Sequence, residues 1–339
     1  MPLPCAGDGL RGDLCPGAVV PHTQLALSGC LTIVERGRSG GGSVEQLQWG
    51  RRYVAVEPAH FRVDYVINPF MDPAVQPDPE RAMAQWRTMV ATLERLGATV
   101  DVLPQRPDAP DMVYAMNLGL GLVREDGSRH VVMSHMRYAE RRMETLSAAP
   151  WFAAGGATTS YVGRDGVGAH LEAGDAFAFR GDLVVGYGPR TEELALKHLA
   201  TELGVRVRGL RITHPGMYHL DLAFCPLDDR RALVCPAALD DASAAALLDL
   251  VPEPLVLTEE EALTTFCANS VVVGRTVVMP ACPDHVRAQL EAWGFEVVVV
   301  DVSEFHKGGG SIRCLTNPVD LTLGRDLAVV PGGEVLLPA

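Results

Sequence analysis

The residues with the clearest chemical potential lie near the C-terminus, in the segment HKGGGSIRCLTNP at 306–318. Three consecutive glycines, Gly308 to Gly310, lead to Cys314, and Arg313 precedes that cysteine. Glycine lets the backbone approach a substrate closely and offer N–H donors to a developing negative charge. A neighbouring cation favours the thiolate, which is the nucleophilic form of cysteine. The segment therefore predicts a cysteine nucleophile, and the alternative is a buried structural cysteine in a glycine-rich turn.

A cysteine nucleophile needs a general acid and base, and His219 in the segment MYHLDLAF is the best candidate. The alternating pattern predicts a strand, on which His219 and Asp221 would share one face. A carboxylate beside a histidine can orient the ring and keep it charged. The alternative is a core histidine paired locally, and a lone histidine favours that alternative.

A further carboxylate, Glu172, opens the segment HLEAGDAFAF at 170–179. It could accept hydrogen bonds from a planar cation, because a guanidinium presents its donors as a fork that matches a carboxylate. The alternative is an ordinary turn that leads into a strand.

Four more polar residues lie in short motifs elsewhere in the chain. Asp111 and Asn117 are six residues apart in PDMVYAMN, a strand-like run on which they would share a face. Alternatively, Asp111 belongs to the preceding turn and Asn117 only ends the strand. Arg141 in YAERRMET and Arg190 in GYGPRTEE could bind a carboxylate through paired hydrogen bonds, although most arginines are solvated surface residues.

The elements that must position these residues follow a repeated pattern. Helical periodicity, a glycine and an apolar strand recur in PDPERAMAQWRTMVATLERLGATVDVLP, TEELALKHLATELGVRVRGLRI and PACPDHVRAQLEAWGFEVVVVDV, with DDASAAALLDLVPEPLVLT as a weaker copy. FRVDYVINPF reads as a further strand, and DAFAFRGDLVVGYG, RALVCPAAL and SVVVGRTVVMP read as strand pairs. Two strands, a helix and a strand per unit predict a radial, propeller-like α/β fold. A doubly wound sheet would instead alternate single strands with helices.

Composition narrows the class of protein. The 339 residues carry 29 Lys and Arg against 42 Asp and Glu, a net charge of −13. Such an acidic chain repels nucleic acid and anionic membranes and suits a small cationic ligand. Eight cysteines without zinc-like spacing, no signal peptide and no membrane-length apolar run predict a cytoplasmic protein with reduced thiols. We expect residues 1–50 to be a flexible extension, 51–330 one catalytic domain, and 331–339 a tail.

Taken in order, the motifs PDMVYAMN, ERR, LEAGD, GPRT, YHLD and GGGSIRC resemble the guanidino-modifying pentein superfamily, over residues 52–325. That superfamily includes dimethylarginine dimethylaminohydrolases, arginine deiminases, arginine dihydrolases and amidinotransferases. The resemblance implies an α/β pentein propeller of five ββαβ modules, with the active site in its central channel. The segment FRVDYVINPFMD resembles the branch that includes bacterial dihydrolases.

The resemblance also implies a role for each candidate residue. Cys314 would be the nucleophile and His219 the general acid and base, with Glu172 as a further catalytic group. Glu172 and Asp221 would grip the guanidinium of the substrate. No metal or organic cofactor is implied.

The resemblance assigns the remaining candidates to the rest of the substrate. Asp111 and Arg190 would hold the α-amino and α-carboxylate groups, Arg141 would support them, and Asn68 would line the pocket. Asn117 departs from the pattern of the deiminases and dimethylarginine hydrolases, which have Asp at this position, and is similar to the arginine dihydrolases. An Asn there brings no charge and can both accept and donate hydrogen bonds.

These observations predict a hydrolase that cleaves guanidinium C–N bonds of arginine or a close derivative through a covalent amidino intermediate on Cys314. A dihydrolase would give ornithine, ammonia and carbon dioxide. The alternatives are a dimethylaminohydrolase or deiminase that gives citrulline, an amidinotransferase, and a non-catalytic arginine-binding protein. The expected partner is a small cationic guanidino compound, and assembly into a homo-oligomer is compatible with the sequence.

Overall fold

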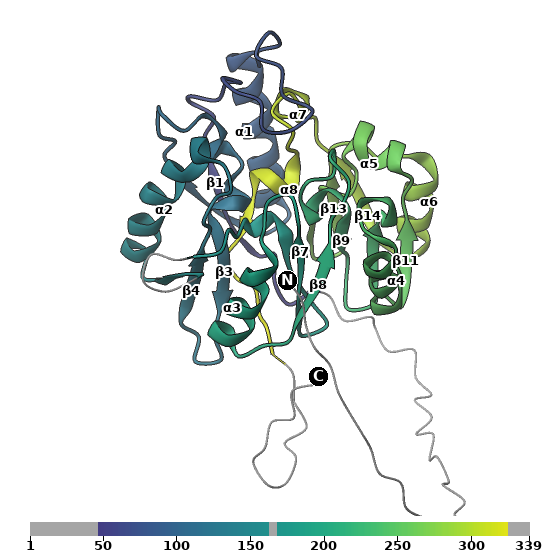
Figure 1. The fold of residues 1–339 in the computed structure, drawn as a ribbon. Coiled ribbons are helices and arrows are strands. Elements are labelled where there is room, and N and C mark those ends of the chain that lie inside the picture. Colours follow the sequence, from purple (N-terminus) through teal and green to yellow (C-terminus); the bar gives the residue numbers. More distant parts are fainter. Residues whose placement is uncertain (1–46, 163–167, 325–339) are drawn as a thin grey trace, which may run out of the picture. The chain divides into compact units, whose positions relative to one another are not determined.

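The computed structural model describes residues 47–162 and 168–324, which form five three-stranded sheets arranged around a common centre (Figure 1). In each sheet the first strand runs antiparallel to the middle strand, and the third runs parallel to it. A helix joins each parallel pair, because parallel neighbours need a crossover connection. The predicted propeller of five ββαβ modules is therefore confirmed.

The modules share this order of strand, strand, helix and strand, and their bounds are as follows. The first three comprise β15 (Asn317–Pro318), β1 (Arg52–Val56), α1 (Pro79–Arg95) and β2 (Thr99–Leu103); β3 (Gly119–Val123), β4 (Arg129–Met133), α2 (Arg142–Ala154) and β5 (Thr158–Tyr161); and β6 (Ala176–Phe179), β7 (Asp182–Tyr187), α3 (Glu193–Leu203) and β8 (Val207–Arg211). The last two comprise β9 (Phe224–Pro226), β10 (Arg231–Val234), α4 (Asp241–Leu250) and β11 (Glu253–Val256); and β12 (Val271–Val273), β13 (Thr276–Met279), α6 (Asp284–Ala292) and β14 (Glu296–Val299). Connecting helices are α5 (Glu259–Thr265), α7 (Ser303–His306) and α8 (Ile312–Leu315).

The ring is closed by the two ends of the described chain. β15 pairs with β1 in the register Tyr53↔Pro318 and Val54↔Asn317. Next to this pair, the Asp320 carboxylate accepts hydrogen bonds from the backbone N–H groups of residues 50, 51 and 52, at 2.7–3.1 Å. The C-terminal strand thus completes the first module. Trp49 is also buried in the domain, at 6% exposed, although the sequence placed it in the extension.

The first helix shows how the sequence specifies these elements. The Asp78 side chain accepts a hydrogen bond from the backbone N–H of Arg81, and Pro79 occupies the first helical position. Both features are typical of a helix N-terminus. Gly97 follows the helix with φ of +92°, a conformation that other residues rarely adopt. The apolar face buries Met89 and Leu93 completely, and each such side chain stabilises the fold by about 1.5–3 kcal/mol.

Several predicted strands are absent from the described residues, and the reasons are local. Residues 61–70 form no strand, because the Gln76 side chain bonds both backbone polar groups of Val63 and the Asn68 side chain bonds the N–H of Phe70. RALVCPAAL contributes one strand, β10, followed by a 3₁₀ turn at Pro236–Ala238. PDMVYAMN forms two 3₁₀ helices, Pro110–Val113 and Ala115–Leu118.

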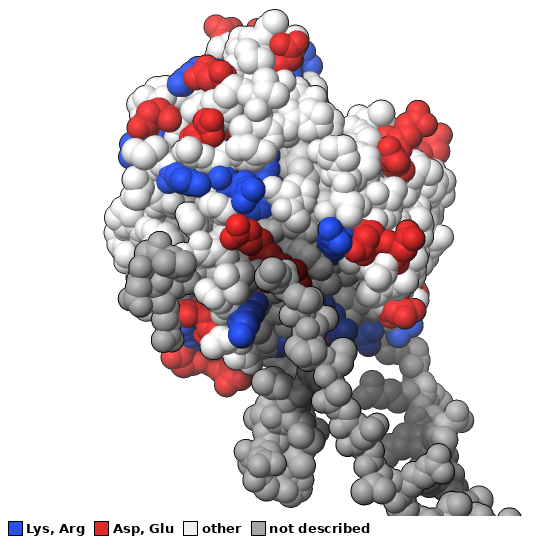
Figure 2. Space-filling view, in the orientation of Figure 1, with Lys and Arg blue, Asp and Glu red and all other residues white. Residues whose placement is uncertain are grey.

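The described residues also bear on thiols, charge and membrane contact. Their cysteines, which are 225, 235, 267, 282 and 314, are free thiols, whereas Cys5, Cys15 and Cys30 lie outside the described residues. Acidic and basic side chains both lie on the face shown in Figure 2. None of the described helices combines the length and the apolar character needed to cross a membrane. Most of the predicted extension and the whole predicted tail lie outside the described residues.

Candidate active site

The short helix α8 carries Cys314 into the centre of the ring of sheets (Figure 1). Cys314 is only 3% exposed and borders a small central cavity. A larger hollow beside Arg124 and Glu202 contains none of the predicted site residues. The central cavity, by contrast, is lined by most of them, together with their neighbours: Ile67, Asn68, Asp111, Tyr114, Asn117, Arg141, Arg190, Tyr218, His219, Gly308, Gly310 and Cys314.

The sulfur atom of Cys314 has two polar neighbours. Its thiol donates to Oδ2 of Asp221 at 3.3 Å, and Nδ2 of Asn269 donates to the sulfur at 3.1 Å. Burial, and then the negative charge of Asp221, raise the pKa of the Cys314 thiol well above its ordinary value. We expected the neighbouring Arg313 to lower this pKa. That expectation is wrong, because burial has the larger effect and the pKa is raised. The Arg313 guanidinium packs over the Phe177 ring, at 4.7 Å from its centroid.

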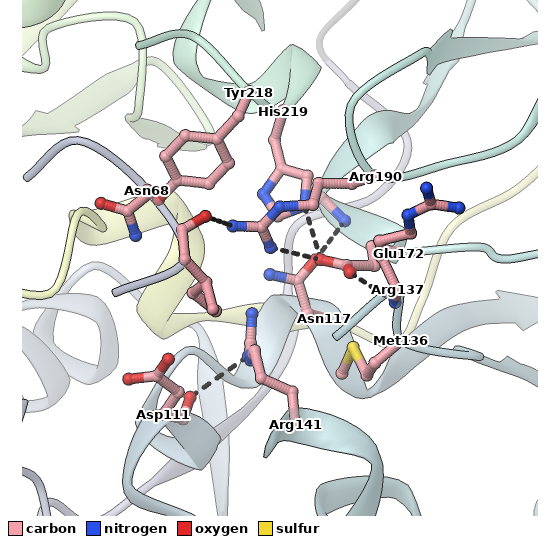
Figure 3. Close-up of polar contacts among 12 residues, drawn as sticks. Asn68, Asp111, Asn117, Met136, Arg137, Arg141, Glu172, Arg190, Tyr218 and His219 are labelled. Atoms are coloured by element: carbon pink, nitrogen blue, oxygen red, sulfur yellow. Dashed lines mark hydrogen bonds and ion pairs between the residues drawn. The ribbon is translucent and has the colours of Figure 1, made fainter. Parts of the chain in front are cut away.

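His219 is held by a buried carboxylate. Its Nε2 lies 2.8 Å from Oε2 of Glu172, and the same oxygen accepts from Nη1 of Arg190 at 3.0 Å (Figure 3). The other Glu172 oxygen accepts from the backbone N–H of Arg137 at 2.9 Å. Burial alone would raise the pKa of Glu172, but the Arg190 charge and the His219 hydrogen bond outweigh it and hold this pKa well below its usual range.

The lowered pKa favours the anionic form of Glu172, whose carboxylate contacts the imidazole ring and orients it. Because Nε2 of His219 contacts Glu172, Nδ1 is the ring nitrogen that this contact does not use. The sequence assigned Glu172 to the substrate guanidinium as well, but both of its carboxylate oxygens already bind groups of the protein. His219 is extended and Leu220–Leu222 is a 3₁₀ helix, so a turn, rather than the predicted strand, brings His219 and Asp221 together.

A glycine that the sequence did not single out allows this convergence. A Cβ atom on Gly174 would lie 2.9 Å from Oδ1 of Asn117, 3.0 Å from Oδ2 of Asp221 and 3.4 Å from Nδ1 of His219. Real Cβ atoms essentially never approach other atoms as closely as the first of these distances. The glycine of the LEAGD motif is therefore required by the packing of three site residues, and not only by a turn.

At the opposite end of the cavity, Arg141 is fixed by two bonds to Glu144, at 2.7 and 2.9 Å. It also donates to the backbone oxygen of Asp111 at 3.2 Å (Figure 3). Oδ1 of Asp111 is buried and has no hydrogen-bond partner among the described residues. Burial raises the pKa of Asp111 to about 6 and that of Glu144 to about 7. An unpaired buried acceptor of this kind suits a cationic group such as an α-ammonium.

The three glycines before Cys314 serve packing rather than oxyanion binding. Their N–H groups bond to the backbone oxygens of Phe305 and His306, so the predicted set of free donors is not formed. Gly309 has φ of +90°, and a Cβ there would lie 2.7 Å from the Tyr218 hydroxyl. That hydroxyl donates to the Gly309 oxygen at 2.6 Å, and the Asn68 amide donates to the Gly308 oxygen at 3.0 Å. The glycines therefore allow the wall of the cavity to close.

Arg190 crosses the middle of the site between two aromatic rings. Its guanidinium carbon lies 4.7 Å from the centroid of the Tyr138 ring and 4.5 Å from that of Tyr218. Such stacking fixes the plane of a guanidinium while leaving its edge free to bind carboxylates. In the described residues, no group of three or more His, Cys, Asp or Glu side chains is placed to hold a metal ion.

The structure thus forms two buried pairs, Cys314 with Asp221 and His219 with Glu172. Cys314 and His219 line the same cavity as Asn68, Asp111, Asn117, Arg141 and Arg190. Two residues that sequence reasoning missed contact these site residues: Asn269 bonds to Cys314, and Glu144 bonds to Arg141. The available signal for Asn269 was its place before β12, which resembles the place of Asn117 before β3.

Comparison with known proteins gives consistent matches over the described domain. The family model for eukaryotic N,N dimethylarginine dimethylhydrolase matches residues 57–321. An N(G),N(G)-dimethylarginine dimethylaminohydrolase of Mycobacterium tuberculosis is 38% identical over 269 residues, covering 78% of this chain and 85% of that protein. The bifunctional arginine dihydrolase/ornithine cyclodeaminase ArgZ of Synechocystis is 33% identical over 270 residues, covering 78% of this chain but 37% of that protein.

Solved structures agree with these matches. The N-terminal domain of the cyanobacterial arginine dihydrolase ArgZ, bound to its substrate, has a TM-score of 0.75 at 32% identity and covers 80% of this chain and 99% of that domain. A dimethylarginine dimethylaminohydrolase adduct with 4-chloro-2-hydroxymethylpyridine has a TM-score of 0.61 at 20% identity, covers 79% of this chain and 99% of that chain, and supports the fold alone.

Proposed function

This chain belongs to the dimethylarginine dimethylaminohydrolase family, within the pentein superfamily of guanidino-modifying enzymes, and we propose that it is an arginine dihydrolase. As a member of this family it is a hydrolase of guanidino C–N bonds. The proposed overall reaction is arginine plus two waters to ornithine, two ammonia and carbon dioxide. Catalysis uses Cys314 as nucleophile and His219 as general acid and base.

The observation that carries the dihydrolase proposal is the orientation of Asn117. Its Oδ1 accepts a hydrogen bond from the backbone N–H of Gly174 at 2.9 Å, so the amide nitrogen is the part left to face the cavity. An amide nitrogen can only donate. It suits the ureido oxygen of citrulline, which is an acceptor, better than the guanidinium of arginine, which is a donor. A site that binds citrulline in this way can retain it for a second hydrolysis.

In the first step, the Cys314 thiolate attacks the guanidinium carbon, forming a C–S bond. Protonated His219 delivers its proton to a departing nitrogen, the C–N bond breaks, and ammonia leaves a cationic amidino thioether. The Asp221 carboxylate, 3.3 Å from the sulfur, holds the planar cation for attack. Asp111 binds the α-ammonium group, while Arg190 and Arg141 bind the α-carboxylate.

In the second step, water adds to the same carbon and passes one proton to His219. The C–S bond breaks and the thiolate departs, while the remaining proton converts ammonia to ammonium, leaving citrulline. A second cycle on the ureido carbon releases the second ammonia and a carbamate of ornithine, which loses carbon dioxide.

The main rival is hydrolysis of a methylated arginine to citrulline and an alkylamine, which the matching family model and the mycobacterial relative support. An amidinotransferase would pass the amidine from the same adduct to an amine. Incubation with arginine labelled with ¹³C in the guanidino carbon separates these activities, because only the dihydrolase releases labelled carbon dioxide with ornithine.

The experiment offers arginine, asymmetric dimethylarginine, agmatine and citrulline in parallel, and includes arginine with glycine. We expect arginine to give ornithine with little accumulated citrulline, and citrulline to be consumed. Labelled citrulline as the sole product would overturn the dihydrolase proposal, as would turnover of dimethylarginine alone. Cys314→Ala is the control for turnover that does not depend on the thiol.

A further inference from the structure

We propose that Asn269 is a further catalytic residue, whose side-chain amide stabilises the thiolate of Cys314. The inference rests on the proposed role of Cys314 as nucleophile. Asn269 is completely buried and precedes β12, 45 residues before Cys314. It belongs to the fifth module, whereas Cys314 leads into the strand that closes the first.

Three hydrogen bonds fix the Asn269 side chain. Its Oδ1 accepts from the backbone N–H of Cys314 at 3.1 Å. Its Nδ2 donates to the backbone oxygen of Asp221 at 3.0 Å and to the sulfur of Cys314 at 3.1 Å. The amide orientation is unambiguous, because a backbone N–H must face the oxygen and a backbone carbonyl must face the nitrogen. The donor to the sulfur is therefore held in place by two independent contacts.

Comparison with equivalent positions in the other modules separates the structural role from the chemical one. Each module has a buried Asn or Asp just before or at the start of its first strand: Asn117, Asp175, Asp221, Asn269 and Asn317. Oδ1 of Asn117 accepts from the N–H of Gly174, and Oδ1 of Asp175 accepts from the N–H of Leu220, both at 2.9 Å. These side chains join one module to the next. Oδ1 of Asn269 makes the same kind of bond to Cys314.

A carboxylate is sufficient for this joining role, as Asp175 demonstrates. At position 269 the chain has an amide instead, and its nitrogen contacts the reactive sulfur. A carboxylate would place a second acceptor, and a second negative charge, beside Asp221 and Cys314. The choice of Asn over Asp is therefore explained by the sulfur contact and not by the joining role.

The hydrogen bond from Asn269 to the Cys314 sulfur is stronger in one charge state of the sulfur than in the other. A neutral thiol is a weak acceptor, whereas a thiolate is a strong one, so the Asn269 donor favours the thiolate. It opposes the burial and the Asp221 charge that raise the pKa of the thiol. The same bond is available to the thiolate when it departs from the tetrahedral intermediate. Asn269 thus acts on both the formation and the breakdown of the covalent adduct.

Two substitutions test the donor separately from the joining role. Asn269→Ala removes all three contacts, whereas Asn269→Asp keeps an acceptor for the N–H of Cys314 but removes the donor. We expect kcat for arginine to fall about 10- to 100-fold in Asn269→Ala, the effect of losing one hydrogen bond to a charged group, with KM nearly unchanged. Asn269→Asp should be at least as impaired, because its carboxylate opposes the thiolate. If Asn269 only positioned the helix, Asn269→Asp would restore activity, and the proposal would be wrong.

A measurement without substrate keeps this inference independent of the proposed function. The rate of alkylation of Cys314 by iodoacetamide, followed by peptide mass spectrometry across a pH series, reports the thiolate fraction. Asn269→Ala should shift the midpoint of this pH dependence, which reports ionisation of the Cys314 thiol, to higher pH by about one to two units. Asn317→Ala is the matched control, since Asn317 is equally buried but donates to the backbone oxygens of Ala115 and Gly119.

The control should lower thermal stability without shifting the Cys314 midpoint. An unshifted midpoint in Asn269→Ala, with the fold intact by circular dichroism, would overturn the inference even if arginine is the substrate. Conversely, a shifted midpoint in a protein that fails to hydrolyse arginine would retain the role of Asn269 and overturn only the substrate.

Discussion

Cys314 donates its thiol proton to Asp221 across 3.3 Å in a buried site, so the charge of one residue controls that of the other. Burial raises the pKa of Asp221, and burial together with the Asp221 charge raises that of Cys314. The pair therefore disfavours two negative charges in the absence of a cation. A guanidinium placed between them reverses this preference, so the cation that is to be attacked also promotes formation of the thiolate. In the proposed mechanism, Cys314 is therefore a nucleophile that its substrate activates.

Asp221→Asn should separate these two effects. Without the neighbouring negative charge, the Cys314 thiol should ionise at lower pH and react faster with iodoacetamide near neutral pH. The kcat/KM for arginine should nevertheless fall about 10- to 100-fold or more, because the guanidinium loses a charged hydrogen-bond partner. Asp228→Asn is a control for substitution of a buried carboxylate, because Asp228 caps the β9–β10 turn away from the cavity. Unchanged kcat/KM in Asp221→Asn would exclude Asp221 from substrate binding.

Glu172→Gln should damage stability and catalysis together. Glu172 is a buried anion between His219 and Arg190, and a neutral amide would leave Arg190 as an unpaired buried cation. Removing one partner of a buried pair costs about 3–5 kcal/mol of unfolding free energy. Chemical denaturation with and without the substitution measures this loss. Glu192→Gln is the matched control, since its pair with Arg137 is exposed and should contribute less than about 1 kcal/mol.

Gly174→Ala should inactivate the enzyme without unfolding it. The added methyl group would displace Asn117, Asp221 and His219 from the arrangement that their close approach requires. We expect kcat to fall at least about 100-fold, since small misplacements of catalytic groups are costly. The overpacking should cost about 1–3 kcal/mol of unfolding free energy, which leaves the protein folded. Gly155→Ala at the end of α2 is the control, because Gly155 has φ of −74° and lies outside the cavity. Activity of Gly174→Ala equal to that of the control would contradict the role given to this glycine.

If Asp111 binds the substrate as proposed, it should link substrate binding to pH. Burial raises its pKa from an ordinary 3.8 to about 6, so the carboxyl group is protonated below pH 6 in the folded protein. Because the folded pKa is the higher one, the contribution of Asp111 to stability is complete below the unfolded pKa and is lost as pH rises to about 6. The loss is on the order of 3 kcal/mol. KM for arginine should rise as pH falls below 6, because the α-ammonium then meets a neutral acid.

An analogue of arginine that lacks the α-amino group, δ-guanidinovaleric acid, isolates this effect. It brings no ammonium to Asp111, so its KM should not show the increase at acidic pH that is attributed to this carboxyl group. Asp111→Asn should likewise remove that increase for arginine, while raising KM throughout. A parallel rise in KM for both compounds in the unaltered protein would assign the titration to another residue.

Much of the fold could be predicted because its signals are local. The cap of α1 at Asp78, the glycine after that helix and the Arg180–Gly181 turn between β6 and β7 each lie within a few residues of the element they control. The segment at 61–70 was misjudged because its alternation is that of a strand, yet its polar groups bond to the side chains of Gln76 and Asn68. Alternation alone carries no information about the presence of a partner strand.

The site shows the same division between local and distant signals. The types and order of Cys314, His219 and Arg190 could be read from motifs. The hydrogen bonds of Glu172 with His219 and Arg190 could not be read from motifs, because His219 lies 47 residues and Arg190 lies 18 residues further along the chain. Asn269 was missed for the same reason, since nothing within CANSVVV indicates a cysteine 45 residues later. The sequence also could not show that the N–H groups of the three glycines bond to backbone oxygens within their own turn.

Asn117→Asp should change the product more than the rate. The carboxylate could still accept from the N–H of Gly174, as Oδ1 of Asn117 does, and its second oxygen would face the cavity as an acceptor. An acceptor there should strengthen binding of the arginine guanidinium but should repel the ureido oxygen of citrulline. Citrulline would then leave before the second hydrolysis. With ¹³C-labelled arginine, we expect labelled citrulline to replace labelled carbon dioxide as the main product, and unchanged release of carbon dioxide would refute the role of Asn117.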